Sequence, residues 1–279
     1  MDIAQLRTWI GREEPARDVA APGPLDRLAA LLDHDAPLWP EKAVPPLGHW
    51  LYFLPRARQS ALGDDGHPLR GGFLPPAPLP RRMWAGGELS FHRPIRLGAA
   101  LERVSTIEDV TAKTGASGEM VFVTVRHAIS ADGEPAIEER QDIVYRAPAA
   151  PDGSVPASPS EARAAEVSRE HLAGPVALFR FSALTFNSHR IHYDRDYARG
   201  EEGYPGLVVQ GPLIATLLMD LYLRERPDGT VRSFSFRAHA PLFDIAPFTL
   251  NLTHDGGGAD LWAADAGGRV AMTARVEGA

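Results

Sequence analysis

Apolar and polar residues alternate in short runs in both halves of the chain. The alternating runs cover residues 101–110, 120–129 and 143–146 in the first half and residues 234–236, 248–252 and 270–276 in the second half. A period of two places successive side chains on opposite faces of a strand, so each run predicts a strand with one buried face. Glycine-rich turns at residues 255–258 and 265–268 separate the runs of the second half. We therefore expect a curved antiparallel sheet in each half.

Helical spacing replaces this alternation in a few places. From Pro212 to about Glu225, apolar residues recur at i, i+1, i+4, i+5 and i+8, which is one face of a helix, and Pro212 suits its first turn. A shorter helical pattern covers residues 25–32, and residues 44–54 form an apolar element that proline opens. The stretch around Phe181 has no helical periodicity. The pattern predicts one helix laid on one sheet, occurring twice.

A segment without bulky apolar residues separates the two halves. Residues 147–160 read APAAPDGSVPASPS, and proline with small residues is typical of a connector that buries little surface. We divide the chain into a first half of residues 1–146, a linker of residues 147–173 and a second half of residues 174–279.

The two halves share a weak internal repeat. HRPIRLG at residues 92–98 can be laid over HAPLFDI at residues 239–245, and Pro46 can be laid over Pro212. The shared order, with the apolar element first and the His-x-Pro strand later, favours a duplication.

Composition and charge exclude several classes of protein. The chain has 279 residues, which predicts roughly two domains or one large one, and its 44% hydrophobic residues exclude disorder over most of the length. The 29 Lys and Arg against 36 Asp and Glu give a net charge of -7, which argues against nucleic acid as a partner. The chain contains no cysteine, which excludes disulfides, thiolate metal sites and cysteine nucleophiles.

No membrane partner is expected either. The most apolar long stretch, residues 206–223, is interrupted by Gln210, Gly211, Pro212 and Asp220, whereas a span needs about 20 mostly apolar residues. Residues 1–18 have neither the apolar run of a secretory signal nor the acid-poor composition of a transit peptide. We expect a cytoplasmic protein.

The candidate chemistry is concentrated in FNSHRIHYDRDYA at residues 186–198 and YPGLVVQGPL at residues 204–213. This stretch resembles the hydration motif of the MaoC-like, or R-specific enoyl-thioester hydratase, superfamily, which runs Asp-x-Asn-Pro-x-His with a later Gly before a helix. The match is closer to the branch of type 2 hydroxyacyl-thioester dehydratases and mesaconyl-C4-CoA hydratases, whose signature is Asn-x-His-Arg-Ile-His-Tyr-Asp. FLPPAPLPRRMWAGG at residues 73–87 also resembles that branch.

The resemblance implies an α+β double hot-dog fold, in which two curved sheets each wrap a central helix. It implies a hydro-lyase that adds water reversibly to a 2-enoyl-CoA, and mesaconyl-C4-CoA (3-methylfumaryl-CoA) going to citramalyl-CoA is the favoured reaction. A 3-hydroxyacyl-thioester dehydratase of fatty acid synthesis follows closely. The implied partner is an acyl-CoA or acyl-ACP substrate, and a homodimer is common for such architectures.

One departure from the superfamily motif affects the chemistry. On the motif's spacing the acidic position is Asn187 and the histidine is His192. An amide cannot take up a proton as a carboxylate does. Either His192 makes both proton transfers, or Asp194, Tyr193 or His189 supplies the second group.

Hydration of an enoyl thioester requires a base, an acid and a donor to the thioester oxygen. A neutral imidazole at His192 can take a proton from water and return it to the substrate. Gly211 precedes the predicted helix, so its N–H lies where the helix dipole is positive, and a missing Cβ lets a ligand approach. We therefore assign catalytic roles to His192, Asn187, Gly211 and Asp194.

A second set of residues is assigned to substrate binding: Arg190, Tyr193, Gln210, Arg81, Arg82 and Trp84. Arg190 could pair with a substrate carboxylate or a CoA phosphate, or could bridge to Asp194 or Glu201. The segment of residues 55–90 is expected either to close over the substrate or merely to cover a sheet edge.

The first half lacks both parts of the motif. Leu38 or Trp39 stands where the second half has His192, and Pro45, which has no N–H, stands where it has Gly211. We expect one active site per chain, with the first half as a degenerate hot-dog that leaves room for a longer or branched acyl group.

Two other functions are compatible with the fold, because fold alone does not fix function. A hot-dog thioesterase would release free thiol, and a non-catalytic acyl-thioester binder would show no activity alone. We expect no cofactor and no metal site, because no matching His, Asp or Glu cluster accompanies the closely spaced His189 and His192.

Overall fold

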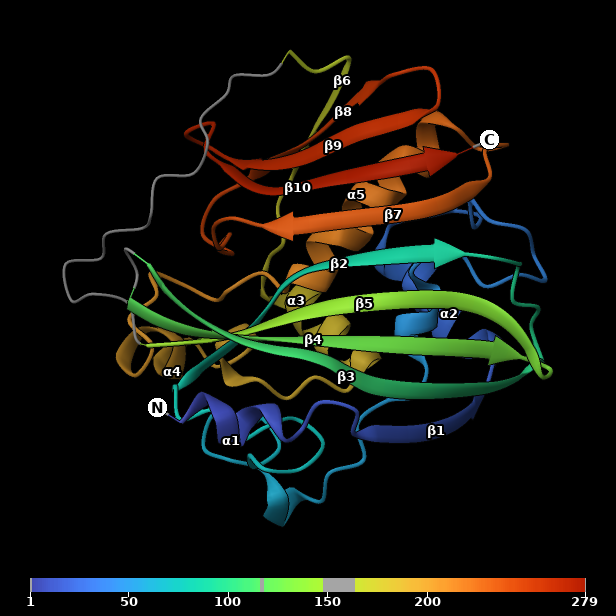
Figure 1. Ribbon diagram of the computed structural model, residues 1–279. Coiled ribbons are helices and arrows are strands. Elements are labelled where there is room, and N and C mark those ends of the chain that lie inside the picture. The colour runs from blue at the N-terminus through green and yellow to red at the C-terminus, as the bar shows by residue number, and fades with distance from the viewer. Residues whose placement is uncertain (1, 116–117, 148–163, 279) are drawn as a thin grey trace.

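The computed structural model describes residues 2–115, 118–147 and 164–278, and its ten strands form one antiparallel sheet (Figure 1). The strands of the first half are, in order across the sheet, β1 (Glu13–Val19), β3 (Ala100–Gly115), β4 (Gly118–Ala131), β5 (Glu134–Arg146) and β2 (Arg81–Phe91). The second half continues with β7 (Val231–Ala238), β10 (Val270–Gly278), β9 (Gly258–Asp265), β8 (Phe248–His254) and β6 (Val167–His171). The predicted strands are confirmed, and most are longer than the alternation indicated.

The two halves join through β2 and β7, which pair antiparallel from Gly86 opposite Arg237 to Ser90 opposite Ser233. The strand order of one half mirrors the other, so β2 corresponds to β7. The two His-x-Pro segments at residues 92–98 and 239–245 follow these corresponding strands, as the internal repeat predicts. Close contact at the junction requires glycine, because a Cβ on Gly86 would lie 2.7 Å from the carbonyl oxygen of Phe236.

Helix α5 (Gly211–Glu225) is the central helix of the second half and packs on β8, β9 and β10. Every residue from Leu213 to Leu223 is buried, which explains why its apolar positions extend beyond one face. Burying one large aliphatic side chain contributes roughly 1.5–3 kcal/mol, so this helix anchors the core. The arrangement of a curved sheet around a helix confirms the double hot-dog fold in this half.

The corresponding element of the first half is much shorter. Residues 44–54 contain only the 3-10 helix η1 (Gly48–Leu51), because Pro45 and Pro46 precede it and Leu47 has a φ of 67°. Helix α2 (Pro22–Leu31) instead supplies leucines to the core that α5 occupies. The two halves therefore differ in the length of their corresponding elements, because the first half has no long helix at residues 44–54 to match α5.

Helix α3 (Pro175–Thr185) lies where the sequence showed no helical periodicity. Leu178, Phe181 and Leu184 are buried, but Val176 and Phe179 on other sides of the helix are exposed. Apolar residues on all sides hide the period of 3.6, which is why the pattern did not predict this helix.

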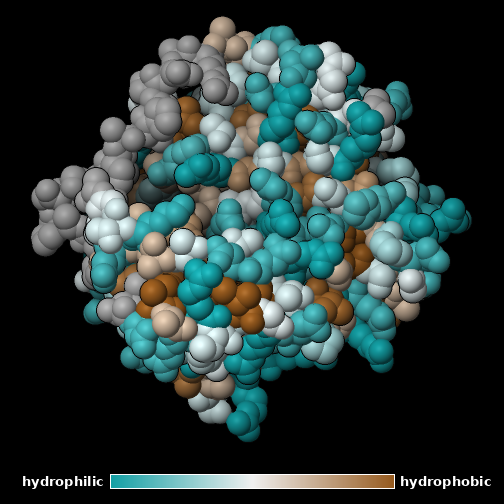
Figure 2. Space-filling view, in the orientation of Figure 1, coloured by the Kyte–Doolittle hydropathy of each residue, from teal (hydrophilic) through white to brown (hydrophobic). Residues whose placement is uncertain are grey.

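The remaining helices are short: α1 (Ile3–Arg7), α4 (Arg195–Gly200), and the 3-10 helices η2 (Gln59–Ala61) and η3 (Arg190–His192). Residues 148–163 of the predicted linker lie outside the described residues. Strand β6, near the C-terminal end of the predicted linker, pairs with β8 in the part of the sheet that the second half forms. Within the described ranges, no helix has the length and apolar character needed to cross a membrane. Figure 2 shows polar side chains over much of one face, with apolar side chains in small groups.

Candidate active site

A cavity of about 390 Å³ lies between the two halves and contains the predicted hydration residues. The second half contributes the segments around residues 187–192 and 208–212, and the first half contributes β2 and residues 65–80. Both His192 and Gly211 line this cavity, so the structure brings together the two groups on which the sequence analysis depends.

His192 is buried at the end of η3, and one hydrogen bond determines its tautomer. Its Nδ1 lies 2.7 Å from the carbonyl oxygen of Val208, which can only accept, so Nδ1 carries the proton and Nε2 keeps its lone pair. Nε2 bonds to no residue in the described part of the chain. Burial lowers the pKa of His192 to about 4, against a raising effect of the Val208 bond, so the ring is a neutral acceptor near pH 7.

Gly211 begins α5, so its N–H has no acceptor within the helix. Pro212 follows and has no N–H, which leaves the Gly211 amide as the donor at the very start of the helix. A Cβ on Gly211 would meet only the carbonyl oxygen of Trp84, at 3.8 Å. The Cβ position of Gly211 is therefore open, and its N–H lies at the end of α5 where the helix dipole favours negative charge.

Asn187 lines the same cavity but cannot act as an acid or a base. Its Oδ1 accepts a hydrogen bond from the backbone N–H of His189 at 3.0 Å, which stabilises the turn that leads into η3. Its position therefore matches the motif, and its chemistry does not.

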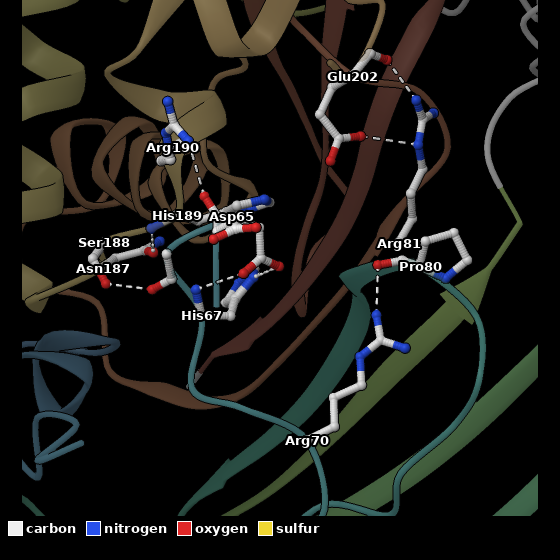
Figure 3. A network of polar contacts seen from close by, with 12 residues as sticks. Asp65, His67, Arg70, Pro80, Arg81, Asn187, Ser188, His189, Arg190 and Glu202 are labelled. Carbon is white, nitrogen blue, oxygen red and sulfur yellow. Dashed lines mark hydrogen bonds and ion pairs between the residues drawn. The ribbon is translucent and has the colours of Figure 1, made fainter. Parts of the chain in front are cut away.

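The carboxylate of Asp65 and the imidazole of His67, both from the first half, also line the cavity. Figure 3 shows the two side chains beside His189. Asp65 Oδ2 lies 3.0 Å from His67 Nδ1. The His67 ring packs on His189 with centroids 4.0 Å apart, and His189 meets the ring of His192 at 5.3 Å. Burial, together with the neighbouring imidazoles of His67 and His192, lowers the pKa of His189 to about 2. The expectation that no acid or histidine cluster accompanies His189 is therefore wrong.

These three side chains bring a carboxylate oxygen and two ring nitrogens within 4.8 Å of one another, which is a donor set that a divalent cation could use. Two of the groups already bond to each other, so the arrangement is that of a hydrogen-bonded pair packed on a third ring. Sequence analysis missed Asp65 and His67, because they lie in an irregular loop far from the motif. The only signal was the suggestion that residues 55–90 cover the substrate.

Backbone contacts fasten this loop to the motif. Ser188 Oγ donates to the carbonyl oxygen of Gly66 at 2.6 Å. Arg190 donates twice: its backbone N–H binds the carbonyl oxygen of Asp65 at 2.9 Å, and its Nη1 binds the carbonyl oxygen of Asp64 at 3.0 Å. Gly66 has a φ of 85°, and a Cβ there would lie 1.9 Å from the carbonyl oxygen of Ser188. Only glycine permits this contact.

Three predicted residues of the motif do not line the cavity. Arg190 binds Asp194 at 2.7 Å and stacks on Tyr197, which is the bridging alternative considered for it. Asp194 also caps α4 by accepting from the N–H of Tyr197. Tyr193 is exposed and donates its hydroxyl to the carbonyl oxygen of Ser188. The structure therefore gives these side chains local partners instead of a place in the cavity.

Gln210 lines the cavity, and its side-chain amide is held by α3. Its Nε2 donates to the carbonyl oxygen of Leu178 and to Ser182 Oγ, both at 3.0 Å, and its buried Oε1 has no hydrogen-bond partner among the described residues. Gln210 thus fixes the start of α5 against α3.

Arg81, Arg82 and Trp84 all line the cavity, but they differ in their partners. Arg81 forms an ion pair of 3.0 Å with Glu202 and lies over the ring of Tyr204, so it connects β2 to the second half. Arg82 forms no ion pair with any described residue and hydrogen-bonds to the hydroxyl of Tyr145. Trp84 also borders a second cavity.

The second cavity, of about 260 Å³, lies against the first-half sheet and shares Trp84, Gln141, Asn187 and Pro212 with the first. Buried Glu139 lies on its wall and accepts three hydrogen bonds, from His49 Nε2 at 3.0 Å and from Trp50 Nε1 and Gln141 Nε2 at 2.9 Å.

Three polar atoms on residues of the second cavity are unsatisfied, and His49 Nδ1 is one of them. Arg103 Nε and His127 Nε2 are buried and have no hydrogen-bond partner, and Arg103 forms no ion pair with any described residue. Buried donors without partners are costly, and a polar ligand would satisfy them.

Comparisons with known proteins agree with this geometry. The family model of hydroxyacyl-thioester dehydratase type 2 matches residues 47–244. The chain is 49% identical to mesaconyl-C(4)-CoA hydratase of Chloroflexus aurantiacus, over 99% of each chain. It is 27% identical to the mitochondrial hydroxyacyl-thioester dehydratase type 2 of Schizosaccharomyces pombe, over 88% of this chain and 91% of that protein.

Solved structures support the fold. A MaoC-like dehydratase from Phytophthora capsici superposes with a TM-score of 0.71 at 12% identity, over 99% of each chain. HtdX of Mycobacterium tuberculosis superposes with a TM-score of 0.66 at 16% identity, over 96% of this chain and 100% of that one. At these identities the likeness extends to the fold alone.

Proposed function

The chain belongs to the hydroxyacyl-thioester dehydratase type 2 family, and from that premise we infer that it is a hydro-lyase that adds water reversibly to a 2-enoyl-CoA. The observation that carries this proposal is that the free Nε2 of His192 and the free amide of Gly211 border one cavity. We propose mesaconyl-C4-CoA as the substrate and citramalyl-CoA as the product, as the name of the relative with 49% identity suggests.

In this reaction one proton of water goes to His192 Nε2 while the water oxygen bonds to C3 of the enoyl group. The C2=C3 electron pair then moves toward the thioester oxygen, where the Gly211 N–H stabilises the developing charge. His192 returns the same proton to C2, which completes the addition and restores the neutral ring.

The second cavity favours a substrate whose acyl group ends in a polar group. A mesaconyl group joined to CoA through C4 keeps a free carboxylate. Of the arginines considered for such a carboxylate, Arg190 is engaged by Asp194, Arg81 by Glu202 and Arg82 by the hydroxyl of Tyr145. Among the described residues of the second cavity, Arg103 is a half-buried cation without an ion pair, and His127 adds a ring nitrogen without a partner. That cavity shares Asn187 and Pro212 with the cavity of His192 and Gly211.

The function is tested with crotonyl-CoA, mesaconyl-C4-CoA and a long 2-enoyl-CoA. We expect loss of the conjugated enoyl absorbance without release of thiol, most rapidly with mesaconyl-C4-CoA. His192→Ala should lower kcat about 100-fold or more, because deletion of a general base costs that much. A loss of only a few-fold would remove His192 from the reaction, and thiol release would indicate a thioesterase.

The carboxylate site is tested by Arg103→Met. We expect kcat/KM for mesaconyl-C4-CoA to fall about 10- to 100-fold, because the variant loses a hydrogen bond to a charged group. The kcat/KM for crotonyl-CoA, which has no carboxylate, should stay unchanged. Arg140→Met is the matched control, because Arg140 lies on β5 outside both cavities and pairs with Glu108. An equal loss with both substrates would contradict carboxylate binding by Arg103.

A further inference from the structure

We propose that His67, oriented by Asp65, holds the attacking water together with His192, and so takes the place of the carboxylate that is missing at position 187. The inference rests on the proposed hydratase function and concerns residues of the first half that lie far from the motif in the sequence. Figure 3 shows Asp65 and His67 beside His189.

The bond between Asp65 and His67 determines which ring nitrogen is free. His67 Nδ1 lies 3.0 Å from Asp65 Oδ2, and the backbone N–H of His67 donates to Asp65 Oδ1 at 2.9 Å. Burial raises the pKa of Asp65, but these bonds and the nearby imidazoles of His67 and His189 lower it more, so the carboxyl is ionised. An ionised carboxylate only accepts, so His67 Nδ1 is protonated and Nε2 is an acceptor.

The His67 ring is accessible from the cavity and stays neutral there. Its side chain keeps 20% exposure, and its Nε2 bonds to no residue in the described ranges. Burial lowers its pKa, and the positive charges of Arg82 and Arg70 lower it further, against the raising effect of Asp65. A neutral ring with a free Nε2 supplies the acceptor that an aspartate at position 187 would have offered.

His189 is a weaker candidate for the same role, although it lies between the other two rings. Its side chain bonds to no described residue, so nothing selects one of its tautomers. His67, in contrast, has its tautomer fixed by Asp65. Its loop is also fixed, by the three hydrogen bonds from Ser188 and Arg190. An acceptor held in advance costs less to organise when the substrate binds.

The proton balance of the reaction is unchanged by this role. Of the two water protons, one passes to His192 Nε2 and from there to C2. The other stays on the oxygen, hydrogen-bonded to His67 Nε2, and becomes the hydroxyl proton of the product. His67 therefore touches the reacting water, whereas Asp65 is a positioning residue that acts through His67.

Steady-state kinetics of three variants test the proposal. His67→Ala should lower kcat about 10- to 100-fold with little change in KM, because a misplaced water slows the chemical step without weakening thioester binding. Asp65→Asn should lower kcat in the same way, because its amide can donate to Nδ1 and move the ring proton to Nε2. Asp64→Asn is the matched control and should match wild type, because its exposed side chain forms no hydrogen bond with a described residue.

Two further measurements separate this role from a structural one. In ¹⁵N NMR, His67 should show the Nδ1–H tautomer in the wild type and the Nε2–H tautomer in Asp65→Asn. The double variant His67→Ala/Asp65→Asn should be no slower than His67→Ala, because Asp65 acts through the ring.

The proposal is overturned if His67→Ala keeps kcat within about twofold of wild type while His192→Ala loses activity, a result that leaves the proposed function intact. It is also overturned if EDTA abolishes activity and zinc restores it, since the pair would then bind a cation. If wild type hydrates none of the enoyl-CoA substrates, the proposed function itself fails.

Discussion

At His192, a single hydrogen bond to a backbone carbonyl selects the tautomer in which Nε2 can accept a proton. The Val208 carbonyl takes the Nδ1 proton, which leaves the lone pair of Nε2 on the other side of the ring. Burial keeps that ring uncharged, so no neighbouring carboxylate is needed to select its tautomer. The proposed base at His192 therefore does not depend on a carboxylate at position 187, where this chain has Asn187.

Gly211 offers a residue-level test with an internal control. Gly211→Ala should leave the thermal stability nearly unchanged, because its Cβ would meet only the Trp84 carbonyl at 3.8 Å. The added methyl group would nevertheless enter the thioester space and should lower kcat/KM about 10- to 100-fold, as small displacements of reacting groups do.

Gly174→Ala is the matched control, because Gly174 also precedes a proline at a helix start and has no neighbour within 4 Å of a Cβ. Gly174 does not line the cavity, so this variant should keep full activity. Equal rates for Gly211→Ala and wild type would show that the Cβ position of residue 211 does not face the bound thioester.

At the scale of elements, the loop before β2 depends on one tight contact with the motif. Gly66→Ala should detach this loop, because its Cβ would lie 1.9 Å from the carbonyl oxygen of Ser188. We expect faster proteolytic cleavage within residues 55–80 and a loss of kcat similar to that of His67→Ala.

Gly71→Ala is the control for backbone strain, because Gly71 has a φ of 90° and no neighbour within 4 Å of a Cβ. It should cost only the roughly 1–2 kcal/mol of an alanine in the left-handed region. If both variants are cleaved at the same rate, the contact with Ser188 does not hold the loop.

Elements with a regular pattern could be predicted from the sequence, and contacts between distant elements could not. The alternating runs predicted the strands, and the spacing after Pro212 predicted α5, because each pattern reflects burial within one element. The resemblance of the motif pointed to His192 and Gly211. Asp65 and His67 reach the cavity through a turn that is fixed only by its tertiary contacts with Ser188 and Arg190, and no local pattern encodes that.

At the scale of the whole molecule, the cavity belongs to neither half alone. The second half supplies the groups assigned to proton transfer and thioester binding, and the first half supplies β2, the loop before it and the polar wall of the second cavity. The first half therefore contributes to the site although Pro45 stands where the second half has the donor Gly211.

Buried histidines predict how the stability of the whole fold depends on pH. Burial lowers the pKa of His67, His127, His189 and His192 below the ordinary 6.5. The unfolded chain therefore binds protons that the folded chain does not, and stability present above pH 6.5 is lost as the pH falls toward the folded value of about 4 for His192.

Thermal melts followed by circular dichroism at a series of pH values check this expectation. The Tm should be highest above pH 6.5 and should already decline before the pH reaches 4.5, the ordinary pKa of a glutamate. A Tm that stays constant until the carboxylates titrate would contradict the role of the histidines.

The pairing of β2 with β7 has a consequence for how such a protein can change. In an assembly of two identical chains, any substitution occurs in both subunits, so a change that is useful in one subunit also affects the other. Here both halves belong to one covalent chain, so a substitution changes one half only. Pro45 can stand before the short η1 in the first half while Gly211 is kept at the start of α5 in the second half, and each half can change independently.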